Sequence, residues 1–198
     1  QIDIAIIIPI LENKSDYKKL VNKYKNLLHI KFFIIYSKDK NKHLGKMINI
    51  AILKAFTDKF SKILILNPYS VFNTINIFDF IYNINEPVIF INDNLYDTNY
   101  NMFSTILINV STLYFFNGYS NIVDNESIYF NLYLRLKHFN LSIKYKNVDF
   151  DILKSKSKKK IKKQYDNFLD SGIDTLLFNT IKQKNYYTNY YKIKVKLF

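Results

Sequence analysis

The residues best placed for chemistry follow a short apolar run in the first third of the chain. Residues 63–66 are four consecutive aliphatic residues, and Asn67-Pro68-Tyr69-Ser70 come directly after them. Such a run is typical of a strand covered on both faces in the middle of a parallel sheet, where ligand sites lie beyond the carboxyl ends of the strands. Residues 67–70 offer no carboxylate, imidazole or glycine loop, so residue chemistry alone predicts few catalytic groups there.

Histidine, glycine and cysteine patterns add no further catalytic site. His29, His43 and His138 lie far apart in the chain with no carboxylate at a useful spacing, which disfavours a histidine metal site. The three glycines form no phosphate-binding loop. The chain has no cysteine, which excludes disulfides and thiolate metal sites. The sequence therefore predicts no metal site.

Seven lysines are concentrated between positions 154 and 163. The chain as a whole has a formal net charge of +13. The segment 154–163 would suit the phosphates of a ligand or of nucleic acid, or an acidic protein, and a solvated loop without a partner is the plain alternative. Tyr186, Tyr187, Tyr190 and Tyr191 could stack on bases. Arg135 is the only arginine among 29 basic residues, so the codon usage of an AT-rich genome also explains the charge. The clustered lysines are Lys154, Lys156, Lys158, Lys159, Lys160, Lys162 and Lys163.

Hydrophobic periodicity predicts an α/β fold with a mostly parallel central sheet flanked by helices. Strands are expected at 2–8 (closed by Pro9), 31–36 and 61–66, with helices at 15–28 and 47–56 between them. Later segments predict helices at 75–82, 110–116 (capped by Asn109) and 128–139, and strands at 87–91, 103–108 and 141–145. Alternation at 191–197 predicts an antiparallel edge strand. We expect one domain over 1–198, with halves at 1–73 and 74–198 and a basic loop at 154–163.

Five short stretches, in this order, resemble segments of one known family. They are Ile-Ala-Ile-Ile-Ile-Pro at 4–9, Lys-Met-Ile-Asn-Ile-Ala at 46–51, Phe-Asn-Gly-Tyr at 116–119, Arg-Leu through Asn-Leu-Ser-Ile at 135–143, and Leu-Asp-Ser-Gly-Ile-Asp-Thr-Leu at 169–176. Together they resemble the catalytic domain of the β1,4-galactosyltransferase family, which has the GT-A glycosyltransferase fold. The resemblance covers nearly the whole chain and implies a UDP-sugar donor, a glycan or protein acceptor and inversion at the anomeric carbon.

The resemblance also implies a manganese site at the end of the central strand, where the family has Asp-Val-Asp. Pro68-Tyr69-Ser70 stand at those positions, and the Met and His expected near 152–157 are missing. A serine hydroxyl is a poor ligand for a hard divalent ion, so the chain departs from the family at its metal. The residues expected to contact the donor nucleotide are Pro9, Ile10, Asn13, Lys46, Asn67, Tyr69 and Ser70.

A general base would have to come from the segment that matches the acceptor loop of the family. Asp124 and Glu126 are the carboxylates there, each by a shift of register. The alternative is that both are first-turn residues of the helix that follows, where acidic side chains favour the helix dipole. Asp93 and Asp97 lie on another loop that follows a predicted strand.

Three functions stay open at this point. The first is a divergent glycosyltransferase-like domain, the second a pseudoenzyme that serves as an interaction module of a larger assembly or parent polypeptide, and the third a basic nucleic-acid-binding domain. No apolar run approaches the roughly 18 residues of a membrane span. The lack of cysteine and of a signal peptide favours the cytoplasm, and the resemblance gives the Golgi lumen as the alternative.

Overall fold

The structure is a computed structural model, and its helices and strands follow one another in the predicted α/β order. It describes residues 4–10, 16–24, 27, 29–37, 44–66, 70–72, 77–91, 105–121, 127–148, 150–152, 173, 178–185 and 190–197. The helices are α1 (Asp16–Tyr24), α2 (Leu44–Thr57), α3 (Ile77–Asn83), α4 (Val110–Phe115) and α5 (Ser127–His138). The strands are β1 (Ile4–Ile10), β2 (Ile30–Ser37), β3 (Lys62–Ile65), β4 (Ser70–Phe72), β5 (Val88–Ile91), β6 (Ile106–Asn109), β7 (Lys144–Asn147), β8 (Phe150–Ile152), β9 (Phe178–Asn185) and β10 (Tyr190–Leu197).

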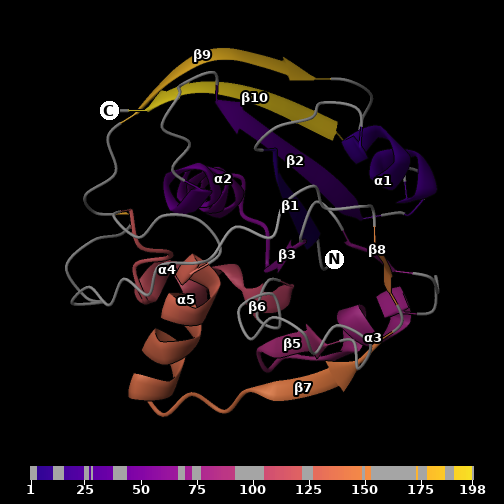
Figure 1. The fold of residues 1–198 in the computed structure, drawn as a ribbon, viewed down its shortest axis with the longest axis vertical. Coiled ribbons are helices and arrows are strands. Elements are labelled where there is room, and N and C mark those ends of the chain that lie inside the picture. Colours follow the sequence, from indigo (N-terminus) through magenta and orange to yellow (C-terminus); the bar gives the residue numbers. More distant parts are fainter. Residues whose placement is uncertain are drawn as a thin grey trace.

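An eight-stranded sheet in the order β7-β5-β6-β3-β1-β2-β10-β9 forms the centre of the molecule. β1 is parallel to β2 and β3, β2 to β10, and β5 to β7. β6 is antiparallel to both β3 and β5, and β9 is antiparallel to β10. The prediction of a mostly parallel sheet with an antiparallel part is confirmed, and Figure 1 shows the sheet from β9 and β10 at the top to β7 at the bottom.

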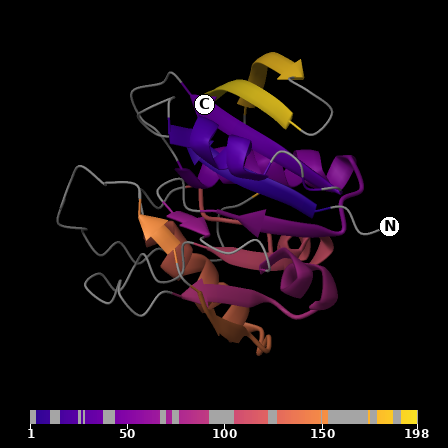
Figure 2. The same cartoon turned by 90° about the vertical axis from the view of Figure 1, so that its right-hand side faces the viewer.

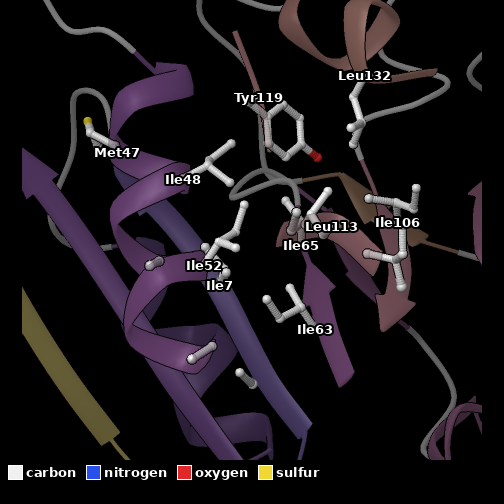
Figure 3. Close-up of a cluster of buried hydrophobic side chains, with 14 of the residues drawn as sticks. Ile7, Met47, Ile48, Ile52, Ile63, Ile65, Ile106, Leu113, Tyr119 and Leu132 are labelled. Atoms are coloured by element: carbon white, nitrogen blue, oxygen red, sulfur yellow. The ribbon is translucent and has the colours of Figure 1, made fainter. Parts of the chain in front are cut away.

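Helices cover the two faces of this sheet, as expected for strands that are apolar on both sides. α2, α4 and α5 pack on one face, where Ile63 and Ile65 of β3 join the core cluster, and Figure 3 shows these side chains together with Ile48 and Ile52 of α2. α1 and α3 pack on the other face, which receives Leu64. The turned view of Figure 2 shows the C-terminal strands in yellow at one end of the molecule and α5 in orange at the other. β3 is therefore buried on both faces, as its sequence predicts.

Pro9 does not end the first strand, contrary to the prediction from its position. β1 continues to Ile10, and Pro9 lies opposite Ile35 of β2. The Ile7 carbonyl accepts a hydrogen bond from the Leu66 N–H at 3.0 Å, so alternate residues of β1 direct their polar groups towards β3. Pro9 has the same direction as Ile7 but lies beyond the last β1–β3 pair, so its missing N–H interrupts no ladder bond.

The C-terminal strand is antiparallel to its neighbour β9, but β9 rather than β10 forms the edge of the sheet. β10 lies one position inside and is parallel to β2. Alternation in the sequence shows only that a strand has two unlike faces, and it carries no information about a further strand at 178–185 that covers its outer edge. The opposite edge, β7, is exposed along its whole length.

Candidate functional site

The carboxyl ends of β1, β2 and β3 lie at the same edge of the sheet, because these strands are mutually parallel. α2 begins at this edge and runs back along the sheet, so Lys46 in its first turn lies on the same side as Ile10. Lys46 is half-buried, whereas Pro9 is buried and Ile10 is only 6% exposed within the core under α1. Contacts of β1 with a ligand at this edge would therefore come from its backbone.

Two short strands lie beyond the end of β3 and bring distant segments together. Ser70 follows Leu66 by four residues, so it lies within about 14 Å of the strand end. β4 pairs antiparallel with β8, which places Ser70 opposite Ile152 and Val71 opposite Asp151. The two segments expected to form the metal site of the family are thus adjacent, with serine and isoleucine at the paired position.

These strands do not fit a manganese ion. Of their six residues only Asp151 carries a carboxylate, and none is a histidine or methionine. Within the described ranges of the chain, no three His, Cys, Asp or Glu residues lie close enough together to hold a metal. Other predicted site residues lie outside the described residues, so their positions stay predictions: Asn13, Asn67, Tyr69, Asp124, Glu126, Asp93, Asp97 and the lysines of 154–163.

A buried turn at 117–121 adjoins this region and follows α4 directly. Asn117 and Gly118 both have φ near +63°, the left-handed conformation that ends a helix. The Gly118 N–H donates to the Leu113 carbonyl at 2.9 Å, and the Asn117 N–H to the Tyr114 carbonyl at 3.0 Å. The Asn117 carbonyl in turn accepts from the Ile173 N–H at 3.1 Å. The Asn-Gly stop predicted for this helix is therefore confirmed.

Asn49 of α2 holds the buried turn through three hydrogen bonds. Its Nδ2 donates to the Tyr119 carbonyl at 2.7 Å and to Asn121 Oδ1 at 2.9 Å. Its Oδ1 accepts from the Tyr119 N–H at 2.8 Å. Asn49 is fully buried, so these bonds satisfy backbone groups that water does not reach.

Arg135 of α5 holds the same turn from the other side. Its side chain is only 1% exposed, its Nε donates to Asn131 Oδ1 at 3.0 Å, and its Nη1 donates to the Gly118 carbonyl at 3.3 Å. The fork of a guanidinium can serve a side-chain amide and a backbone carbonyl at once, which a single ammonium group does less well.

Glycine is required at two closely packed places, one against a backbone and one against side chains. A Cβ at Gly45 of α2 would overlap the Ser120 carbonyl oxygen, so this helix can lie against the turn only without a side chain there. A Cβ at Gly118 would overlap Asn49 Oδ1 and crowd Ile173. α2, α5 and the turn are therefore fitted together by both hydrogen bonds and close packing.

The side chain of Tyr119, a residue of the turn, packs in the hydrophobic core, and its hydroxyl is buried there. Its ring packs edge-on against Tyr129 at 6.1 Å, and Figure 3 shows it between Ile48 and Leu132 of the same cluster. Among the described residues its hydroxyl has no hydrogen-bond partner. Burial, with a smaller contribution from Tyr129, raises the pKa of Tyr119 well above its ordinary value. Tyr119 stays neutral at physiological pH.

The sequence contains two signals for this turn that were not used to predict it. Asn49 is a polar residue inside the apolar run 47–52, which indicates a buried amide with a fixed partner. Arg135 is the only arginine of a lysine-rich chain, which indicates a position where the guanidinium itself is needed. Neither signal specifies the partners in the turn, because these lie 17 to 72 residues away in the chain.

No protein-family model matches this sequence, and no curated protein matches it. Solved structures do match. The catalytic domain of Drosophila β1,4-galactosyltransferase 7 in complex with xylobiose superposes with a TM-score of 0.81 at 14% identity, covering 100% of this chain and 94% of that one. A mutant of the Drosophila enzyme in complex with manganese, UDP-Gal and xylobiose gives a TM-score of 0.78 at 14% identity over the same shares. The chain therefore has the GT-A fold of galactosyltransferase catalytic domains.

Proposed function

We propose that this chain is a glycosyltransferase-type domain that binds a UDP-sugar at the carboxyl ends of β1 and β3, with lysine side chains in the place of a metal ion. The observation that carries this proposal is the pairing of Ser70 with Ile152. Lys154, the first residue of the basic segment, is two residues from Ile152 and so lies within about 7 Å of it. On this proposal the start of the basic segment, two residues beyond Ile152, supplies positive charge to the diphosphate.

The neighbouring groups suit a diphosphate. Lys46 adds a further ammonium in the first turn of α2, at the helix end that carries partial positive charge. Positive charge at the leaving diphosphate is what a nucleotide-sugar transfer requires, whether from a metal or from side chains. The proposed site contains no manganese, because the residues of β4 and β8 do not fit this ion.

If the domain transfers the sugar, the buried turn at 117–121 supports the acceptor side. The turn leads directly into the segment that contains Asp124 and Glu126. Either carboxylate could take the proton from the acceptor hydroxyl during an inverting transfer. The second candidate is a domain that binds the nucleotide sugar without transferring it. It is favoured because serine and isoleucine, which have no carboxylate, occupy positions 70 and 152.

Binding and turnover separate these candidates. Calorimetric titration with UDP, UDP-Gal and UDP-glucose, each with and without manganese, should show binding that manganese does not strengthen. Replacing the lysines of 154–163 by glutamine should abolish that binding and leave the thermal unfolding temperature unchanged. No heat and no thermal shift under any condition would exclude a nucleotide-sugar function. UDP release that depends on xylobiose and is lost in Asp124→Asn or Glu126→Gln would establish transfer.

A further inference from the structure

A pocket of about 830 Å³ lies beside the amino-terminal end of β3, at the other end of this strand from the proposed UDP-sugar site. It is lined by the C-terminal end of α2, the first residues of β3 and the start of α4, including Phe56, Lys59, Lys62, Asn85 and Asn109. Phe56 follows Lys46 by ten residues of helix, which separates the two places by about 15 Å. The volume is within the range of roughly 300 to 1,000 Å³ that small-molecule pockets occupy.

Lys59 at this pocket has a strained backbone. Its φ is +61°, a conformation that glycine normally takes at the end of a helix. Two bonds hold it there, from the Lys59 N–H to the Phe56 carbonyl at 3.1 Å and from the Phe60 N–H to the Ala55 carbonyl at 3.0 Å. Lys59 is exposed and has no ion-pair partner among the residues that the structure describes. Strain of this kind is concentrated at ligand sites in proteins, and here it places a cation at the pocket.

Lys62 contributes a second cation whose partners are all neutral. It is only 3% exposed, and its Nζ donates to the Ile81 carbonyl at 3.1 Å and to the Tyr82 carbonyl at 2.9 Å. An ammonium has three donors, and two of them have partners among the described residues. Burial lowers the pKa of Lys62, and among the described residues no carboxylate pairs with its charge. An anion in the pocket would compensate this charge.

The lining of the pocket also includes the aromatic ring of Phe56 and the side-chain amides of Asn85 and Asn109. The Phe56 ring is 42% exposed and lies stacked on Tyr114, with ring centroids 4.2 Å apart and planes 7° apart. Stacking fixes the Phe56 ring in place, so it presents a rigid flat face. Asn109 Nδ2 donates to the Asn85 carbonyl at 3.3 Å, and the side chains of both residues line the pocket, where they could bond a ligand. The nearby Asp58 is engaged with Lys54 at 2.7 Å and does not line the pocket.

We propose that this pocket binds a phosphate monoester whose ring lies on Phe56 and whose phosphate lies near Lys59 and Lys62, which both line the pocket. A phosphate monoester carries about 1.5 to 2 negative charges at neutral pH, which two ammonium groups and no lining carboxylate match. Nucleoside monophosphates and hexose phosphates share this chemistry. The site is separate from the proposed UDP-sugar site, so either can be right without the other.

The test is a titration of isotope-labelled protein, followed by NMR through the side-chain amide signals of Asn85 and Asn109. The probes are adenosine monophosphate, glucose 6-phosphate, inorganic phosphate and uncharged glucose. The two ring-bearing phosphates should shift both amide signals, and glucose should shift neither. Phe56→Ala should weaken the ring-bearing phosphates about fivefold or more and change inorganic phosphate little. A response to only one of the two esters identifies the ring.

Lys59 offers a variant that removes the charge without harming the fold. Lys59→Gly relieves the left-handed strain, so it should raise the unfolding temperature and still weaken the esters about fivefold. Lys59→Gln should weaken them as much, whereas Lys18→Gln, which removes one exposed charge on α1, should not. The proposal is overturned if no ester shifts Asn85 and Asn109 at millimolar concentration, or if Lys59→Gln and Lys18→Gln weaken binding equally.

Discussion

Two neighbouring regions of this molecule are held in place in different ways. The buried turn at 117–121 is fixed by side chains, through three hydrogen bonds of Asn49 and one of Arg135, and by the close approach that Gly45 allows. The strand ends near Ile10 and Ser70 are fixed by backbone pairing, through the ladders of β1 with β2 and of β4 with β8.

This difference separates the residues that stabilise the fold from those that would bind a ligand. Side chains at the turn are committed to internal contacts, so their substitution should change the free energy of unfolding. The strand ends would contact a ligand through their backbone and through Lys46 of α2, so replacement of Lys46 should change ligand affinity. The comparison can therefore be tested by variants at adjacent positions.

The largest effect should come from Gly45→Ala. The new Cβ would overlap the Ser120 carbonyl oxygen, and a backbone group of the buried turn has little room to move. We expect a loss of about 3 kcal/mol or more in the free energy of unfolding, measured by urea denaturation. Alanine is otherwise the better helix residue, so a small gain in stability would show that α2 is not fitted closely to the turn.

Lys46→Ala, at the next position, is the matched control for that variant. Lys46 is half-buried on the side of the proposed UDP-sugar site, so its replacement should change stability by about 0.5 kcal/mol or less. It should weaken UDP binding several-fold instead. If both variants lose stability alike, the separation between the two regions is wrong.

Asn49→Leu should have the next largest effect. Leucine fills nearly the same volume but leaves the Tyr119 N–H and carbonyl unpaired in a buried place, at a cost of about 2 kcal/mol. Thermal and urea unfolding measure this loss. Asn83→Leu is the control, because Asn83 is exposed and makes one hydrogen bond, to the Asp79 carbonyl at 2.8 Å. It should stay within about 0.5 kcal/mol of the parent protein.

Much of the strand-end region could be predicted from sequence, because it depends on local patterns. The run of aliphatic residues before Asn67 gave β3, and alternation between its faces explains why Ile63 and Leu64 enter different clusters. The direction of the first three strands follows from the helices that connect them. The effect of Pro9 did not follow, since it depends on where β3 stops pairing with β1.

The buried turn could be predicted only in part. The Asn117-Gly118 stop is local and was predictable, but the partners of Asn49 lie 70 and 72 residues further along the chain. The position of Phe56 shows the same limit. Helical spacing places it with the core residues of α2, yet it is 42% exposed because it extends past the covered face and stacks on Tyr114. Spacing identifies a face, whereas the extent of its cover is a tertiary property.

Arg135→Lys tests whether the single arginine is kept for its geometry. A lysine keeps the charge but offers one ammonium in place of a planar fork, so the Gly118 carbonyl or Asn131 Oδ1 should lose its partner. We expect a loss of about 1.5 kcal/mol in urea denaturation. Lys137→Arg, an exposed position in the same helix, is the reverse control. No loss in Arg135→Lys would mean that codon usage alone accounts for the rarity of arginine here.

Lys62→Met should change the free energy of unfolding least, and this change should depend on pH. Burial holds its folded-state pKa below the ordinary value of 10.5, so between the two values the unfolded chain binds more protons than the folded one. Stability from this group therefore rises with pH across that interval, and the cost of burying the ammonium is fully present below it. Urea denaturation at a series of increasing alkaline pH values should show the parent protein gaining stability relative to Lys62→Met.

The two buried cations should differ in this respect, which extends the comparison between the regions. A guanidinium stays protonated throughout this pH range, so a buried arginine carries its desolvation cost at every pH. In Arg135→Lys the buried turn would contain an ammonium instead, and its stability should then rise with pH as at Lys62. A pH-independent difference between Arg135→Lys and the parent protein would mean that the new lysine reaches water, and that the turn is looser than its packing around Gly45 and Gly118 requires.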